Sequence, residues 1–311
     1  MKTVIFGCGG IAKRIAKGFS YVSGNELVGF GSKDINKAKA YAEEFNLPMY
    51  GNYDYFLNNK DIDAVYIATY NLNHYSLAKT CLEHHKHVIC EKPMFATIQE
   101  NEELFALAKE NNCLLMEAMK AVFLPLNIKI KQMIKDGVIG QVQYMEASFV
   151  RGPRYPETHW IYDLKTGGAL KDVGTYCSAI MNFFTDKTPK VISKYTNQTD
   201  KLADTNAEVV VDYDGIRGRV HASNEIFGDS SLMVCGTKGY IKVPLFWKVG
   251  KGYYVIGADR YELDEEMIND FYYELQHFTD LVNNGILESP VMSKEASNNI
   301  LRVVGKENTK L

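Results

Sequence analysis

Hydrophobic positions in the first 120 residues form short apolar runs that alternate with segments of helical period. Apolar runs of this length, separated by amphipathic segments, predict buried strands joined by helices. We expect strands at residues 4–6, 27–30, 48–50, 64–68, 87–90 and 114–116, and helices at 11–19, 34–45, 74–83 and 97–111. Repeated β-α-β units of this length favour a parallel, doubly wound sheet.

The pattern changes after about residue 120, where strand-like runs follow one another closely. Strands are expected at 141–150, 191–195, 208–213, 217–222, 232–235 and 240–243, and helical segments at 126–135, 168–184, 265–284 and 295–304. The sequences at 212–215 and 236–239 are typical of hairpin turns. Alternation within the runs favours an α+β domain built on a mainly antiparallel sheet. We therefore expect two domains, at residues 1–120 and 121–311.

Composition is ordinary for a soluble globular chain, with 46% hydrophobic and 23% charged residues among 311. A net charge of −3 gives no strong field for nucleic acid or an anionic membrane. No apolar run approaches the roughly 18 residues of a membrane span, and the N-terminus lacks the features of a signal peptide. Six scattered cysteines show no C-x-x-C pair, so we expect no zinc or dithiol site and a reducing cytoplasm.

The turn after the first expected strand has the form G-x-G-x-x-A. The first glycine permits a tight turn, the second lets a pyrophosphate approach the backbone, and the small third residue allows close helix packing. The helix that follows supplies N–H groups and partial positive charge to the phosphates. This context predicts a dinucleotide site rather than a simple glycine-rich turn. Its candidate contacts are Gly7, Gly9, Gly10, Ile11 and Ala12.

The end of the second expected strand bears on the choice between NAD and NADP. NAD sites usually carry a carboxylate there for the ribose 2′-hydroxyl. Here the first carboxylate is Asp34, which is better placed to cap the next helix. Ser32 and Lys33 can donate to a 2′-phosphate, which favours NADP. The alternative is an exposed loop that tolerates NAD.

Lys92 follows the fifth expected strand and precedes a proline that ends it. The carboxyl edge of an open α/β sheet is where ligands bind. On position alone, Lys92 is a solvated surface lysine or a site residue. An ammonium there can stabilise a developing oxyanion or transfer a proton. Glu91 can orient the lysine or the nicotinamide ribose, or it is a plain strand-end carboxylate.

Asp172 and Tyr176 lie four residues apart in a helical segment, so their side chains share one face. The carboxylate can accept from Lys92 or a substrate hydroxyl, and the phenol can donate to the substrate oxygen. The alternatives are a helix-capping carboxylate and an amphipathic core tyrosine. Residues 151–160 form an irregular aromatic and cationic loop, either a pocket wall or a packing loop. Its region supplies the candidate substrate contacts Phe149, Arg154, Trp160 and Tyr162.

Together these stretches resemble the glucose–fructose oxidoreductase/inositol dehydrogenase (Gfo/Idh/MocA) family. The resemblance rests on residues 7–12, 61–69, 71–74, 86–93 and 167–176, and within the family 114–118 and the Asp172…Tyr176 pair look most like the NADP-dependent dimeric dihydrodiol dehydrogenase branch. It implies an N-terminal Rossmann domain, a C-terminal domain with a large open sheet that often forms the subunit interface, and reversible hydride transfer at a carbon bearing a hydroxyl or carbonyl. The implied catalytic residues are Lys92, Asp172 and Tyr176, and the family segments add Thr69, Asn71 and His74 to the candidate cofactor contacts. For His74, local packing at a helix start is the alternative.

Three departures from the family pattern affect the substrate more than the reaction. Tyr70 stands where the family usually has proline, Tyr176 where many sugar-oxidising members have histidine, and the tryptophan usual near Lys120 is missing. The leading hypothesis is an NADP-preferring dehydrogenase of a cyclic polyol, sugar or dihydrodiol, acting as a homodimer or higher homo-oligomer. A regulatory protein that senses NADP(H) without turnover, or a structural interaction protein, is the alternative.

Overall fold

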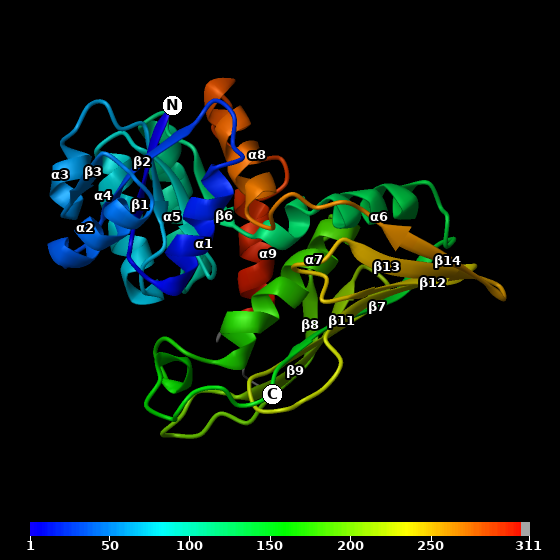
Figure 1. Cartoon of the computed structure of the whole chain (residues 1–311). Helices are drawn as coiled ribbons and strands as arrows, with labels where there is room; N and C mark the ends of the chain where they lie inside the picture. The colour runs from blue at the N-terminus through cyan, green and yellow to red at the C-terminus, as the bar shows by residue number, and fades with distance from the viewer. Residues whose placement is uncertain (306–311) are drawn as a thin grey trace. The chain divides into compact units, whose positions relative to one another are not determined.

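The computed structural model describes residues 1–305, which divide into two compact units (Figure 1). The first unit contains Met1–Met119 and Ile268–Glu295, and the second contains Lys120–Met267 together with the residues from Ala296 onward. Each unit is built on one sheet. The expected boundary near residue 120 coincides with the change of unit. The segment 268–295 was expected in the second domain and instead belongs to the first unit.

The first unit is a six-stranded sheet in the order β3-β2-β1-β4-β5-β6, with every neighbouring pair parallel. Its strands are β1 (Lys2–Phe6), β2 (Glu26–Gly31), β3 (Met49–Gly51), β4 (Ala64–Ile67), β5 (His87–Glu91) and β6 (Leu115–Ala118). All four β4 residues and most of the β1, β2 and β5 residues are buried, which explains why these strands read as continuous apolar runs. The strand order reverses between β1 and β4, and ligands bind at such a switch point.

Helices connect these strands. Four of them lie where the apolar spacing predicts: α1 (Gly10–Phe19), α2 (Ile35–Glu44), α4 (His74–Glu83) and α5 (Ile98–Glu110). The short helical segments α3 (Tyr53–Leu57) and η1 (Asn71–Asn73) were not expected. Asp34 caps α2, because its carboxylate accepts from the amides of Asn36 and Lys37 at 3.0 and 3.2 Å. Thr97 and Glu100 form a capping box at α5. The capping role that the sequence predicts for Asp34 is confirmed.

Helix α8 (Tyr272–Asn283) joins the first unit from far along the chain. It packs on α1 at Gly18, where an added Cβ would lie 3.0 Å from the Cβ of Phe271 and 3.1 Å from a methyl of Leu275. The side chain of Asn25 donates to the Thr279 hydroxyl at 3.0 Å. An amphipathic helix shows which face it buries but not which distant surface covers that face, so its assignment to the first unit could not be predicted from periodicity.

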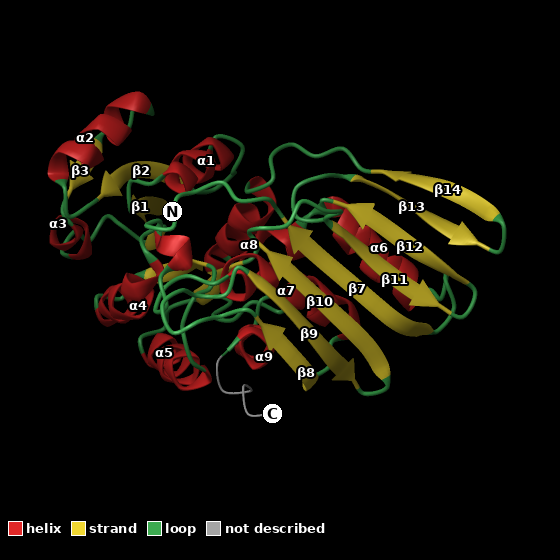
Figure 2. Cartoon of the chain, turned by 90° about the horizontal axis from the view of Figure 1, so that it is seen from below, coloured by secondary structure: helices red, strands yellow, loops and turns green. Residues whose placement is uncertain are grey.

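The second unit is an eight-stranded sheet in the order β14-β13-β12-β11-β7-β10-β9-β8, which Figure 2 shows broadside. Its strands are β7 (Val142–Val150), β8 (Lys190–Thr196), β9 (Asn206–Tyr213), β10 (Ile216–Ser223), β11 (Ser231–Gly236), β12 (Gly239–Pro244), β13 (Lys251–Ile256) and β14 (Asp259–Asp264). Only the β7–β10 pair is parallel; the other neighbouring pairs are antiparallel. The expected fold class is therefore confirmed for both sheets.

Helix α7 (Thr175–Thr185) and the π-helical turn η4 (Leu170–Gly174) pack on one face of this sheet, against β7 and β10. The other helical segments that follow residue 119 in this part of the chain are η2 (Lys120–Phe123), α6 (Pro125–Lys135), η3 (Trp160–Tyr162) and α9 (Lys294–Val304). The face toward α7 is apolar: Gly218 lies against Met181 of α7, and Val220 and Ala222 follow at alternate positions. Arg219 points to the other face and bonds Glu146 and Glu208 across the strands.

Two elements of the second unit differ from the expectations. Strands β13 and β14 were not predicted, because β14 exposes almost every residue and β13 buries only one, so neither gives an alternating apolar signal. The helix expected over 265–284 begins only at Tyr272. The expected hairpin turn at 212–215 is present, with left-handed backbone at Asp214 (φ 53°) and Gly215 (φ 89°).

Candidate functional site

The glycine-rich turn lies between β1 and α1 and leaves room for a phosphate. Gly7 has a φ of 114°, and an added Cβ would lie 2.3 Å from the carbonyl oxygen of Ala68, so only glycine fits there. Gly9 and Gly10 behave differently, because an added Cβ would meet no atom within 4 Å at either position. Gly9 begins the helix without a side-chain cap. The first-turn N–H groups and the open space beside them fit a pyrophosphate.

Cys8 and Ser32 flank this turn on the side of β2. Burial raises the pKa of the Cys8 thiol to about 11, against a smaller lowering by its hydrogen bond with Ser32. The thiol is thus uncharged at neutral pH and adds no negative charge beside the phosphates. The Ser32 hydroxyl accepts from the Asp34 amide at 3.1 Å, and Lys33 is exposed. With Asp34 committed to capping α2, no carboxylate at this strand end is available for a ribose 2′-hydroxyl.

Lys92 lies in a turn that is fixed on both sides by hydrogen bonds. Before it, the Tyr66 hydroxyl donates to Glu91 Oε1 at 3.0 Å. After it, the cis Lys92–Pro93 bond leads to Met94, whose amide donates to Glu117 Oε1 at 3.0 Å. These partners come from β4 and β6, the two neighbours of β5, so the sheet itself determines where the lysine backbone sits.

His74 joins the Lys92–Pro93 turn to the turn after β4. Its Nδ1 lies 3.1 Å from the carbonyl oxygen of Pro93 and its Nε2 lies 3.2 Å from that of Thr69. The ring is 1% exposed, and this burial lowers its pKa, with a smaller contribution from the nearby charge of Lys92. Since both ring nitrogens face backbone carbonyls, His74 positions these two turns.

Asp172 lies in the π-helical turn η4 of the second unit, where Arg151 holds it. The Arg151 guanidinium donates to Asp172 Oδ2 at 2.5 Å and, through Nε, to Asn224 Oδ1 at 2.7 Å. Arg151 and Asn224 directly follow the parallel strands β7 and β10, whose carboxyl ends share one edge of the sheet. Arg151 was expected only as part of the irregular loop 151–160, and Asn224 was not expected in the site.

Tyr176 lies at the start of α7, beside a stacked aromatic pair. The Phe149 ring stacks on Trp247 with centroids 3.5 Å apart and planes 12° from parallel. The same ring contacts Tyr176, with centroids 5.8 Å apart. The structure thus brings together two expected site residues, Phe149 and Tyr176. Trp247 was missed, because a single tryptophan beyond a strand gives no periodic signal.

The remaining loop candidates differ in exposure. Arg154 is exposed and Trp160 is 39% exposed, so both remain accessible in this unit. Tyr162 is buried, and its hydroxyl donates to the Tyr155 carbonyl at 3.4 Å. Within the second unit, Tyr162 therefore supports the loop from inside.

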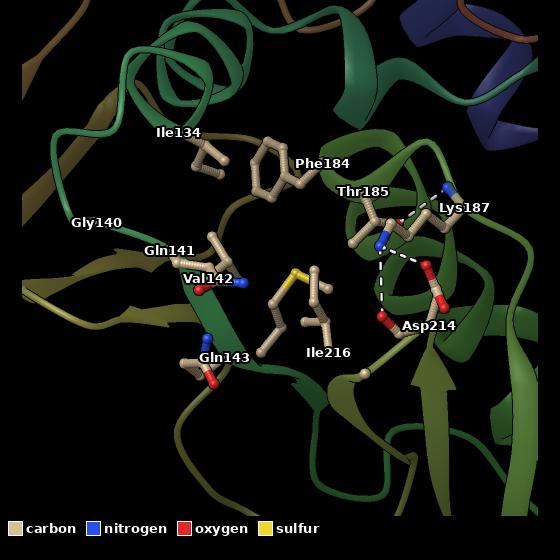
Figure 3. Close-up of a pocket in the computed structure, with 12 residues that line it drawn as sticks. Ile134, Gly140, Gln141, Val142, Gln143, Phe184, Thr185, Lys187, Asp214 and Ile216 are labelled. Atoms are coloured by element: carbon tan, nitrogen blue, oxygen red, sulfur yellow. Dashed lines mark hydrogen bonds and ion pairs between the residues drawn. The ribbon is translucent and has the colours of Figure 1, made fainter.

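A separate pocket of about 400 Å³ opens at the amino end of β7, at the opposite end of that strand from Arg151 (Figure 3). Apolar side chains such as Ile134 and Phe184 form its wall, and an ion pair of 3.0 Å between Lys187 and Asp214 lies at its side. None of the expected site residues lines it. Across residues 1–305, no helix is long and apolar enough to span a bilayer, and no cluster of three or more potential metal ligands is found.

Two family models match the chain. Residues 1–119 match the model described as an oxidoreductase family with an NAD-binding Rossmann fold, and residues 128–242 match the Gfo/Idh/MocA C-terminal domain. Among curated proteins, the trans-1,2-dihydrobenzene-1,2-diol dehydrogenase of Xenopus laevis is 28% identical over 291 residues, covering 90% of this chain and 88% of that protein. The mouse (Mus musculus) enzyme of the same name is 28% identical, covering 87% of this chain and 84% of its own.

Solved structures share the fold over nearly the whole chain. The aldose-aldose oxidoreductase of Caulobacter crescentus, complexed with glycerol, superposes with a TM-score of 0.89 at 21% identity, covering 97% of this chain and 94% of that one. KijD10, a 3-ketoreductase of Actinomadura kijaniata in complex with NADP and TDP-benzene, gives a TM-score of 0.88 at 23% identity, covering 96% and 94%. At these identities the similarity concerns the fold.

Proposed function

This chain belongs to the Gfo/Idh/MocA oxidoreductase family and is an NAD(P)-dependent oxidoreductase; on that premise we propose that it is an NADP-preferring dehydrogenase of a cyclic polyol, sugar or dihydrodiol. The observation that carries the proposal is the turn at Lys92, fixed through Glu91, Pro93 and Met94 at the carboxyl edge of the parallel sheet. β5 lies two strands from β1 in this sheet, about 10 Å at ordinary strand spacing. A dinucleotide lying across the switch point from Gly9 extends toward Lys92.

The proposed chemistry assigns separate roles to three side chains. When bound, the nicotinamide would exchange a hydride with the substrate carbon. The Lys92 ammonium stabilises the negative charge on the substrate oxygen and takes part in moving its proton. Tyr176 donates the proton to that oxygen in reduction and accepts it in oxidation. Asp172 accepts a hydrogen bond from a substrate hydroxyl and so orients the carbon that reacts.

The aromatic surface beside Tyr176 supports a ring-shaped substrate. Phe149 is partly exposed and is backed by the buried ring of Trp247, and a flat apolar ring of this kind can bind an aromatic ring or the apolar face of a sugar. Among the classes considered, we favour a cyclic vicinal diol, because the relatives that span most of the chain are named as dehydrogenases of trans-1,2-dihydrobenzene-1,2-diol.

The cofactor preference and the assembly rest on separate observations. For NADP we rely on Ser32 and Lys33 at the end of β2 and on the use of Asp34 as a helix cap. A homodimer or higher homo-oligomer through the polar face of the eight-stranded sheet, which carries Arg219 and Glu146, stays a prediction. Light scattering of the intact chain in solution tests it, and a monomer at all concentrations would contradict it.

The decisive experiment compares the wild type with Lys92→Ala on a panel of cyclic diols and sugars, following the absorbance of reduced nicotinamide with both cofactors. We expect turnover of the wild type and its loss in the variant, because no other group replaces the lysine charge. Cofactor affinity should change by no more than severalfold, since the phosphates bind at the other end of the dinucleotide site.

Lys60→Ala, which removes an exposed lysine of the same unit, is the matched control and should retain full activity. Near-normal turnover in Lys92→Ala would refute the role of the lysine. Tight dinucleotide binding without turnover of any substrate, unchanged by the substitution, would favour a sensor protein instead.

A further inference from the structure

Arg151 connects the carboxylate of Asp172 to the frame of the sheet. Its amide donates to the Ser223 carbonyl at 2.9 Å, which continues the parallel β7–β10 ladder by one residue beyond the strand. Its guanidinium then spans Asp172 on one side and Asn224 on the other. The backbone of Arg151 is therefore held by Ser223 and its side chain by Asn224, independently of the bond to the Asp172 carboxylate.

The neighbours that hold Arg151 are themselves buried and fixed. Ser223 is fully buried, and its hydroxyl donates to the Thr205 carbonyl at 3.0 Å. The Asn224 amide donates to the same carbonyl at 2.8 Å, and Asn224 is 3% exposed. The side chains of Arg151 and Asp172 are only 20% and 14% exposed, so water screens their attraction less than at an open surface. A charged bond of 2.5 Å in these surroundings strongly restricts the carboxylate.

The orientation of the Asn224 amide supports the same conclusion. Its Oδ1 accepts from Arg151, whereas its Nδ2 is buried without a hydrogen-bond partner among residues 1–305. An unpaired buried donor costs free energy. Turning the amide around would place an N–H against the guanidinium, so the bond to Arg151 fixes the costly orientation. This amide is therefore committed to holding the arginine.

We propose that Arg151, held by Asn224, is a positioning residue that sets the orientation of the Asp172 carboxylate for substrate binding, an inference that rests on the proposed function for its kinetic effect. The backbone of Asp172 is held in the π-helical turn, since its amide donates to the Gly168 carbonyl at 2.9 Å and its carbonyl accepts from the Thr175 hydroxyl at 3.0 Å. The bond from Arg151 then restricts the side chain. Arg151 itself need not touch substrate or cofactor.

The test is a chemical-rescue experiment on Arg151→Ala. We expect kcat/KM for the diol substrate to fall by about 10²-fold, the loss that a misplacement of about 1 Å can cause. Methylguanidinium in the buffer should raise the kcat/KM of Arg151→Ala by about tenfold. In an Asp172→Asn background the further change Arg151→Ala should have little effect, and methylguanidinium should restore nothing. NADPH affinity, measured by fluorescence, should stay unchanged in every variant.

Two variants extend the test. Asn224→Asp gives the guanidinium a second carboxylate to bind, and we expect a kinetic defect in the same direction that is also absent from the Asp172→Asn background. Arg260→Met removes an exposed arginine of the second unit that pairs with Glu262, and it should leave the kinetics unchanged. Additive effects of Arg151→Ala and Asp172→Asn, or equal rescue in both backgrounds, would overturn the inference.

A crystal structure of Arg151→Ala makes the test independent of turnover. We expect the Asp172 carboxylate to rotate away from its wild-type position while η4 and β7 stay in place. An unmoved carboxylate overturns the positioning role even if no substrate is found. Absence of turnover in the wild type, together with a displaced carboxylate in the variant, would instead contradict the proposed function alone.

Discussion

Replacing Gly7 or Gly9 with alanine separates two uses of the glycine-rich turn. Gly7→Ala places a methyl group on a residue with φ of 114°, a backbone conformation that costs an L-residue about 1–2 kcal/mol. The new Cβ also begins 2.3 Å from the Ala68 carbonyl oxygen, and relief of such overpacking typically costs about 1–3 kcal/mol. We therefore expect the variant to lose about 2–5 kcal/mol of stability.

Gly9→Ala should have the opposite profile. Gly9 has φ of −106° and ψ of 174°, which any residue adopts, and its added Cβ meets no protein atom within 4 Å. Its cost is limited to the weaker capping by alanine, less than about 1 kcal/mol. The methyl group nevertheless occupies the space through which a pyrophosphate approaches the helix. We expect the dissociation constant for NADPH to rise by at least about tenfold, equivalent to about 1.4 kcal/mol.

The assay is urea unfolding followed by circular dichroism, combined with NADPH titration of the folded protein by fluorescence. The expected result is a lowered urea midpoint for Gly7→Ala, and for Gly9→Ala a midpoint near that of the wild type with weakened binding. Unchanged NADPH affinity in Gly9→Ala would refute the reasoning, because the dinucleotide would then not cross the start of α1. Equal stability of the two variants would contradict the steric argument.

Two further predictions concern charge in the first unit. Lys33→Asp should shift the ratio of kcat/KM values from NADP toward NAD, with Lys60→Asp as the control for net charge; an unchanged ratio would show that the 2′-phosphate is recognised elsewhere. The second concerns His74, whose pKa is lowered in the folded state, mainly by burial, so that the unfolded chain binds its proton more readily as the pH falls below about 6.5. Stability should therefore decline with falling pH in that range, by up to about 1.4 kcal/mol per pH unit for this group, and His74→Gln should show a shallower decline in urea midpoints between pH 7 and 5. Part of the decline should remain in His74→Gln, because burial also lowers the pKa values of His87 and His277. Identical slopes for the variant and the wild type would refute the role of His74.

The parallel sheet was predictable from the sequence because its strands are buried on both faces. A strand such as β4, with every residue buried, must be apolar throughout, and it appears as an uninterrupted run. The edge strand β14 buries only Leu263, so its composition is that of a loop. Helix α8 was recognised in part, but its start at Tyr272 and its contact with α1 depend on partners about 250 residues earlier.

The candidate site also contains residues with a local sequence signal and residues without one. Gly7 and Lys92 were proposed as site residues because a tight turn and a strand exit leave a local signature in the sequence. Arg151 and Asn224 lie 73 residues apart and become neighbours only when β7 and β10 pair in parallel. A pairing of non-consecutive strands cannot be derived from the strands one at a time. The one signal available in the sequence was that Arg151 and Asn224 each stand just after an expected strand.

The contact of α8 with α1 also bears on the biosynthesis of the chain. Residues 1–119 contain every strand of the parallel sheet, yet Phe271 and Leu275 of α8 cover the helix at Gly18. A nascent chain in which residue 119 has just left the ribosome therefore exposes the surface of α1 around Gly18 until some 150 further residues emerge. The dinucleotide-binding unit is completed only after nearly the whole second unit has been translated. Dissection of this chain into an N-terminal fragment thus requires that α8 be supplied as well.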